Sequence, residues 1–241
     1  MALISELFMN NKLIDSTKIV SKGERNKNIG KVAYKCRHIK RWYEKNSKKT
    51  KKSILLLNLL ESVADYLEVG IVGFGKHISI LAMATRNQHE LQLRILSLIQ
   101  DEKEMDKWQS ESATDGLQVL GGFISMSKQP NIYKADVQDE MDHLELLRKK
   151  WGMPVVKNSM GAGNLAGKLK MKEEHDNVFK LYSKLVHPSS MLVNKTIGID
   201  RFHILLELSL QRYALESLYI VCEDLQIPSS VSKQYGPKIN L

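Results

Sequence analysis

Cysteine is scarce in this 241-residue chain, which holds only Cys36 and Cys222. Neither has a second cysteine at the spacing of a metal-binding motif, so the sequence predicts no zinc site, and no other metal or cofactor is indicated. Two cysteines so far apart are typical of reduced thiols in a cytosolic protein. We therefore expect a cytoplasmic location.

Long uncharged apolar runs are also absent. The two most apolar stretches, residues 53–74 and 77–99, are interrupted by acidic and basic side chains such as Glu61, Asp65 and Arg94. The first residues lack the basic start and long apolar run of a signal peptide. These features argue against a membrane span and favour long amphipathic helices.

Proline occurs only five times, so few positions interrupt a helix. No stretch alternates clearly enough between apolar and polar residues to predict a strand. Apolar residues recur instead at helical spacing, which predicts an all-α fold built as a bundle of long antiparallel helices. We expect a basic N-terminal helical segment (1–52), a helical core domain (53–224) and a loose C-terminal tail (225–241). The expected helices are 28–46, 53–70, 76–100, 101–128, 133–151, 170–187 and 201–224, with a loop at 152–167.

The charge is strongly one-sided near the N-terminus. The whole chain carries 36 Lys and Arg against 27 Asp and Glu, a net charge of +9. Between residues 22 and 52 the only acids are Glu24 and Glu44, and the basic residues there include Lys31, Lys35, Lys40, Arg41, Lys48, Lys49, Lys51 and Lys52. A surplus of this kind indicates an anionic partner such as RNA, another nucleic acid or an acidic protein. The alternative is a solvated helix face that binds nothing, and the sequence does not decide between them.

Charged residues also occur inside an apolar predicted helix, residues 76–100. Arg86 and Glu90 stand four residues apart and therefore share one helix face. They form either an intrahelical ion pair on a wet surface, or part of a polar groove between helices.

A second polar pair ends the predicted helix 170–187. Ser183 and His187 are also four apart, and Pro188 stops the helix directly after His187. His187 either caps the helix or belongs to a functional site. If Arg86 and Glu90 face Ser183 and His187, the four groups could bind a phosphodiester and move protons at it.

These motifs carry a family resemblance over about residues 53–224. The Arg86-x-x-x-Glu90 helix, followed by Trp151, Asn164-Leu165-Ala166 and Phe179-x-x-Tyr182-Ser183-x-x-x-His187-Pro188, resembles a family of uncharacterised all-helical bacterial domains. That family shares an Arg-x-x-x-Glu helix and a later Tyr-x-x-Leu-Ser-x-x-x-His-Pro helix. Phe179 stands here at the usual Tyr and Tyr182 at the usual Leu. The family is in turn similar to the HEPN superfamily of helical RNases and toxin-like proteins.

The resemblance implies a HEPN-like fold, a homodimer, and a metal-independent endoribonuclease or toxin in antiviral defence or a toxin–antitoxin system. His187 would then act as general acid or base, and Arg86 would stabilise the phosphorane charge. Glu90 would orient Arg86, and Ser183 would bind phosphate or fix the tautomer of His187. The chain has no Arg followed by His after four to six residues, the element that HEPN RNases use. The alternative function is a non-catalytic helical module that binds nucleic acid or a partner protein through residues 22–52.

Overall fold

The computed structural model describes residues 22–126, 133–156, 160–194 and 199–232. Within these ranges the chain forms ten helices and no strand, which confirms the predicted all-α class. The helices are α3 (Lys22–Asn46), α4 (Lys51–Gly73), α5 (Ile78–Gln100), α6 (Lys103–Met126), α7 (Tyr133–Lys150), α8 (Ala162–Lys168), α9 (Lys172–Val186), α10 (Ser190–Val193), α11 (Ile199–Asp224) and α12 (Ser229–Ser232).

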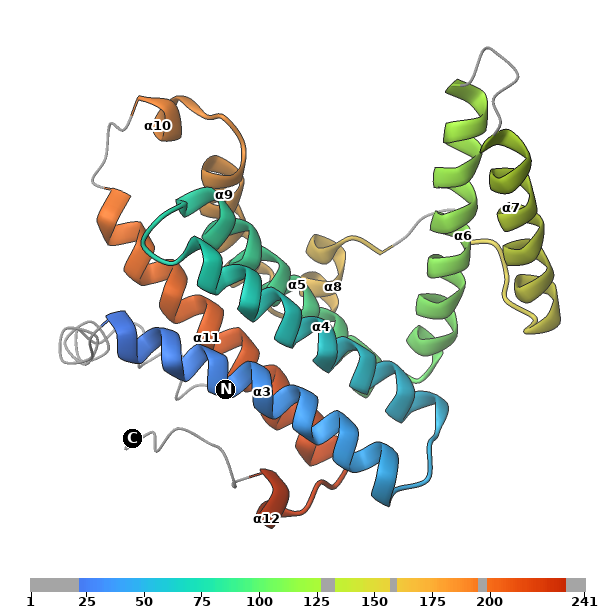
Figure 1. Cartoon of the computed structure of the whole chain (residues 1–241), viewed down its shortest axis with the longest axis horizontal. Coiled ribbons are helices and arrows are strands. Elements are labelled where there is room, and N and C mark those ends of the chain that lie inside the picture. The colour runs from blue at the N-terminus through green and yellow to red at the C-terminus, as the bar shows by residue number, and fades with distance from the viewer. Residues whose placement is uncertain (1–21, 127–132, 157–159, 195–198, 233–241) are drawn as a thin grey trace.

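Four long helices, α3, α4, α5 and α11, make the body of the protein (Figure 1). The links α3–α4 and α4–α5 are short, so consecutive helices run antiparallel, as the sequence predicts. α11 lies against α4, α5 and α3, and α9 packs on α5. The predicted long antiparallel helices are therefore present in the described part of the chain.

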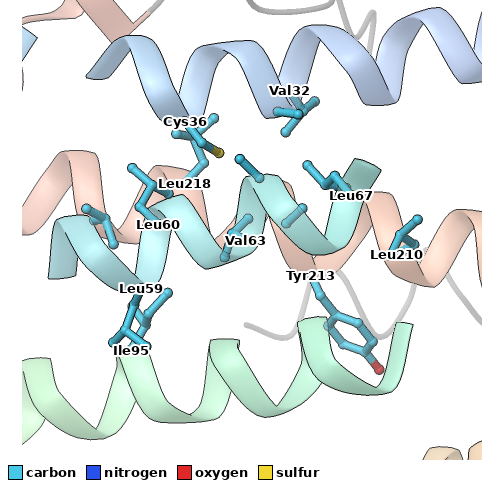
Figure 2. Packing of buried hydrophobic residues seen from close by; sticks show 14 of the residues in the cluster. Val32, Cys36, Leu59, Leu60, Val63, Leu67, Ile95, Leu210, Tyr213 and Leu218 are labelled. Atoms are coloured by element: carbon cyan, nitrogen blue, oxygen red, sulfur yellow. The ribbon is translucent and has the colours of Figure 1, made fainter. Parts of the chain in front are cut away.

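The core between these helices is one continuous apolar cluster, to which α3 contributes as fully as α4 and α11. Figure 2 shows Val32 and Cys36 of α3 facing Leu60 and Leu67 of α4, with Leu210 and Leu218 coming from α11. Burial of each such side chain stabilises the folded state by about 1.5–3 kcal/mol. In its packing, residues 22–46 thus belong to the same core as the predicted core domain.

The turn between α4 and α5 requires glycine. A Cβ atom built on Gly73 would lie 2.7 Å from the Leu81 amide nitrogen, a distance that real Cβ atoms do not reach. The sequence predicts that Gly70 ends the helix, but α4 continues through it to Gly73. Gly70 instead lets the Leu210 side chain of α11 approach the helix backbone closely.

A helical hairpin of α6 and α7 stands beside the body (Figure 1). The two helices contact each other far more than they contact α5, which precedes them in the chain. The sequence predicts an apolar stripe on α7 that ends with Met141, Leu144, Leu147 and Trp151. The first three of these side chains are half-buried, whereas Trp151, which directly follows the end of α7, is 67 % exposed.

Two predicted irregular segments contain helices. The expected loop 152–167 includes the start of α8, whose Leu165 and Ala166 are buried against Leu93 of α5. The expected loose tail includes α12, and Ile227 and Val231 of this segment are buried in the main core. Tertiary packing overrides the weak local signal in both places. Residues 1–21 of the expected N-terminal helical segment and residues 233–241 of the expected tail lie outside the described residues.

Candidate functional site

Arg86 and Glu90 form an ion pair on the side of α5 that faces α9. The Nε of Arg86 donates to Oε1 of Glu90 at 2.9 Å, and both side chains keep about a third of their exposure. The Arg86 guanidinium also lies over the Phe179 ring of α9, 4.5 Å from its centroid. The pair is therefore held by an i,i+4 contact and a cation–π contact, and water still reaches it.

The structure does not join this pair to Ser183 or His187 by any hydrogen bond or ion pair within the described ranges. His187 follows the end of α9, where its backbone N–H donates to the Ser183 carbonyl at 3.3 Å and its side chain is exposed. Phe179, which Arg86 touches, precedes His187 by eight residues, or about 12 Å along a helix axis. Arg86 and Glu90 are thus together, while His187 lies about two turns away along α9.

A buried histidine pair, which the sequence does not indicate, joins α5 and α9 by a polar contact. Nε2 of His89 and Nδ1 of His175 are 3.2 Å apart, and the two rings stack with centroids 5.4 Å apart. His89 is fully buried and His175 is 4 % exposed. Burial, with a smaller contribution from His175 and Arg212, lowers the pKa of His89 to about 4, and burial also lowers the pKa of His175. Both rings are therefore neutral at pH 7, and one donates the shared hydrogen bond.

Residues of α11 complete this polar layer. The His89 ring lies 4.8 Å from the Tyr213 ring, whose hydroxyl donates to Oε1 of Glu174 at 3.4 Å. Arg212 pairs with the same Glu174 oxygen at 3.1 Å and with Glu216 at 2.9 Å. Burial raises the pKa of Tyr213, so the phenol stays protonated. His89, His175 and Tyr213 are buried and neutral, and the charges of Arg212, Glu174 and Glu216 at the partly exposed edge of the layer are paired. Such a layer suits a role in fixing the crossing of α5, α9 and α11.

Helical periodicity gives only a partial signal of this pair. His175 stands four residues before Phe179 and seven before Tyr182, on the apolar face of α9. A histidine on the apolar faces of two helices that pack together is the signal, but the sequence does not show that α5 and α9 meet.

The eight predicted nucleic-acid-binding cations fall into three groups. Lys31, Arg41, Lys48 and Lys49 are exposed and form no ion pair with any described residue. Lys40, Lys51 and Lys52 are ion-paired, with Glu61, Asp106 and Asp224 respectively. Lys35 is buried.

Lys35 therefore does not belong to the accessible surface that the sequence predicts for it. The residue is 2 % exposed, and its Nζ lies 5.9 Å from the centroid of the Tyr219 ring of α11. Burial lowers its pKa. It lies on the inward side of α3, where its long apolar stem packs as a hydrophobic residue would.

The exposed side of α3 carries cations on both sides of an aromatic pair. Lys27, Lys31, Tyr34, His38, Arg41 and Lys45 recur at three- or four-residue spacing and follow one face of the helix; we call these six residues the α3 stripe. Tyr34 is 49 % exposed and stacks with His38, with ring centroids 6.2 Å apart and an angle of 16° between the planes.

The stripe continues into the α3–α4 link through two further exposed cations, Lys48 and Lys49. The next residue, Thr50, fixes the start of α4 by a capping box: its Oγ1 accepts from the Ser53 N–H at 3.1 Å, and its own N–H donates to Ser53 Oγ at 2.8 Å. Lys48 and Lys49 therefore lie on a short link whose C-terminal end is fixed by this capping box.

In the part of the chain that the structure describes, no three His, Cys, Asp or Glu side chains are placed to share a metal ion. None of the helices there combines the length and the apolar character that crossing a bilayer demands.

Comparison with known proteins gives no match. No protein-family model fits the chain, and no curated protein or solved structure is detectably similar to it. Function must therefore be inferred from the chemistry of the chain itself.

Proposed function

We propose that this all-helical protein binds nucleic acid through the α3 stripe together with Lys48 and Lys49. The observation that carries the proposal is a set of exposed cations that no acid of the described chain neutralises: Lys27, Lys31, Arg41, Lys45, Lys48 and Lys49. Arg37 and Lys40 of the same helix are not part of this set, because acids of α4 neutralise them in ion pairs. An unneutralised cationic row of this kind attracts a polyanion.

The length of the row favours a polymer over a small anion. Lys27 and Lys45 are separated by about 27 Å along the axis of α3, at 1.5 Å per residue. A single phosphate or carboxylate needs only one or two cations at one point, whereas a nucleic-acid backbone presents a negative charge at every nucleotide.

The test measures the affinity for a fluorescent single-stranded RNA at several salt concentrations. Lys31→Glu/Arg41→Glu should weaken binding at least tenfold and flatten the slope of log K against log salt by about 1.4, because each lost phosphate contact contributes about 0.7. Lys180→Glu/Lys184→Glu is the matched control, because it makes the same charge change at exposed positions of α9. Equal losses in the two double variants would mean that only net charge matters and would contradict the proposal.

A second candidate function is the metal-independent RNase that the family resemblance implies. The observation that favours it is the water-accessible Arg86–Glu90 pair at the contact of α5 and α9, the helix that ends next to His187. In this proposal Arg86 stabilises phosphorane charge, Glu90 orients it, Ser183 binds phosphate and His187 transfers protons. Because His187 lies about two turns from the Arg86 contact, the two groups would have to act on opposite sides of the bound strand. A HEPN-like arrangement, a homodimer, a cytoplasmic location and a role in bacterial defence belong to the same proposal.

RNA cleavage in excess chelator tests this second candidate. Arg86→Ala and His187→Ala should each abolish cleavage while circular dichroism stays unchanged. His143→Ala, at an exposed position of α7, is the control for removal of a surface histidine. Cleavage by the His187→Ala protein at the wild-type rate would rule out the catalytic role of this residue.

A further inference from the structure

A cleft of about 470 Å³ lies between α4 and the α6–α7 hairpin, away from Arg86 and from the histidine pair. Its walls are mainly apolar and include Leu59 of α4, Leu147 of α7 and the two indoles Trp108 and Trp151. This volume is in the usual range of sites for small ligands.

The two indoles are the distinctive part of the cleft. The Arg94 guanidinium lies 4.0 Å from the centroid of the Trp108 ring and fixes that indole from the α5 side. Trp151 lines the same cleft, yet it remains 67 % exposed, and the two indoles make no ring contact with each other. A flat aromatic ligand gains most from indole faces, so a cleft that both indoles line suits such a ligand.

The polar groups of the cleft suit a neutral ligand with hydrogen-bonding edges. Arg148 is the one cation among the lining residues, and its guanidinium is held by Glu145 at 2.6 and 2.8 Å and by the Met153 carbonyl at 3.0 Å. Its charge is thus balanced within the hairpin. Asn58 and Gln109 also line the cleft, and a carboxamide offers both donors and acceptors, as the edge of a nucleobase does.

The cleft opens beside the end of the proposed nucleic-acid surface. Lys51, at the start of α4, pairs with Asp106, two residues before Trp108. Lys40 of α3 donates to the side-chain Oδ1 of Asn58 at 3.2 Å, so α3 contacts a residue of the cleft wall. The exposed Lys48 and Lys49 precede Lys51, and can hold phosphates next to the cleft.

We propose that this cleft takes a base of a single-stranded nucleic acid between Trp108 and Trp151, while the phosphates of that strand lie on Lys48 and Lys49. The inference rests on the proposed nucleic-acid binding, and it names the preferred ligand class as single strands. A duplex keeps its bases stacked and paired, so it cannot place one in the cleft without first being opened.

The experiment compares Trp151→Ala, Trp151→Phe and Leu146→Ala in titrations with a single-stranded RNA decamer and a duplex of the same length. Stacking on an aromatic side chain contributes about 1–3 kcal/mol per base, so Trp151→Ala should weaken single-strand binding about 5- to 150-fold. Trp151→Phe should recover most of this loss. Leu146→Ala is the matched control, because Leu146 is an exposed apolar residue of α7 outside the cleft. Duplex affinity should be the same in all four proteins.

The outcomes separate this inference from the proposed function. Single-strand binding that weakens in Lys31→Glu/Arg41→Glu but not in Trp151→Ala would overturn the cleft inference alone. Absence of any RNA binding by the wild-type protein would overturn both. A last measurement titrates the protein with adenosine monophosphate and follows tryptophan fluorescence. If this nucleotide quenches the fluorescence at the same concentration at which the decamer saturates the protein, the ligand is a free nucleotide, and the assignment to a strand is overturned.

Discussion

Lowering the pH from 7 to 5 should destabilise the folded protein through His89. This ring is fully buried against His175 and Tyr213, and burial lowers its pKa from the ordinary value near 6.5 to about 4. Between these two values the unfolded chain binds a proton at His89 and the folded chain does not. The unfolded state therefore holds more protons, and the free energy of unfolding falls as the pH falls through this window.

The expected size follows from the same two values. Each pKa unit corresponds to about 1.4 kcal/mol, so the complete shift represents about 3 kcal/mol, of which about 2 kcal/mol is lost between pH 7 and pH 5. His175 adds to the loss in the same direction, because burial lowers its pKa as well. A loss of 2 kcal/mol is a large part of the stability of an ordinary domain.

Urea unfolding followed by circular dichroism at pH 7, 6 and 5 measures this effect. His89→Gln keeps a polar side chain that does not titrate, so the fall in stability between pH 7 and 5 should be about 2 kcal/mol smaller in this variant. If wild type and variant lose the same free energy over this interval, the buried neutral state assigned to His89 is wrong.

Two further predictions concern packing. Gly73→Ala should lower the free energy of unfolding by about 1–3 kcal/mol, because the new Cβ would meet the Leu81 backbone at 2.7 Å. Gly30→Ala, whose Cβ meets nothing within 4 Å, should raise it by up to about 1 kcal/mol, and thermal unfolding that ranks these two variants in the opposite order would contradict the helix packing. Lys35→Met should leave the free energy of unfolding unchanged or raise it, and should leave RNA affinity unchanged, because this amine is buried. A drop in RNA affinity in a folded Lys35→Met protein would mean that Lys35 does belong to the binding surface.

Helical periodicity predicted the bundle well because burial follows the apolar face of each helix. On α3 the spacing of Ile29, Val32, Cys36 and Ile39 predicts an inward face, and all four residues are fully or almost fully buried. The same periodicity does not predict the burial of Lys35. A lysine is expected on the exposed side of a helix, although its apolar stem is long enough to pack inside.

The short helix α8 was missed for a different reason. Three of the eight residues Gly161–Lys168 are glycine, so local propensity predicts a loop. Burial of Leu165 and Ala166 against α5 stabilises the helix instead. A contact of this kind depends on the tertiary fold and leaves little trace in the local sequence.

The candidate site was predictable only within single helices. The Arg86–Glu90 pair follows from i,i+4 spacing and is present. The meeting of His89 with His175 joins residues 86 apart in sequence, and the separation of His187 from Arg86 depends on how α9 lies along α5. Spacing along a chain determines which residues share one helix face, but it does not determine which faces meet.

Photo-crosslinking of a 4-thiouridine-substituted single-stranded RNA to the intact protein, followed by mass spectrometry, tests the nucleic-acid surface most directly. We predict crosslinks in peptides that contain Tyr34, Arg41 and the Lys48–Lys49 link, and their loss at raised salt concentration. Crosslinks confined to α9 and α11, with none in residues 27–49, would contradict the account.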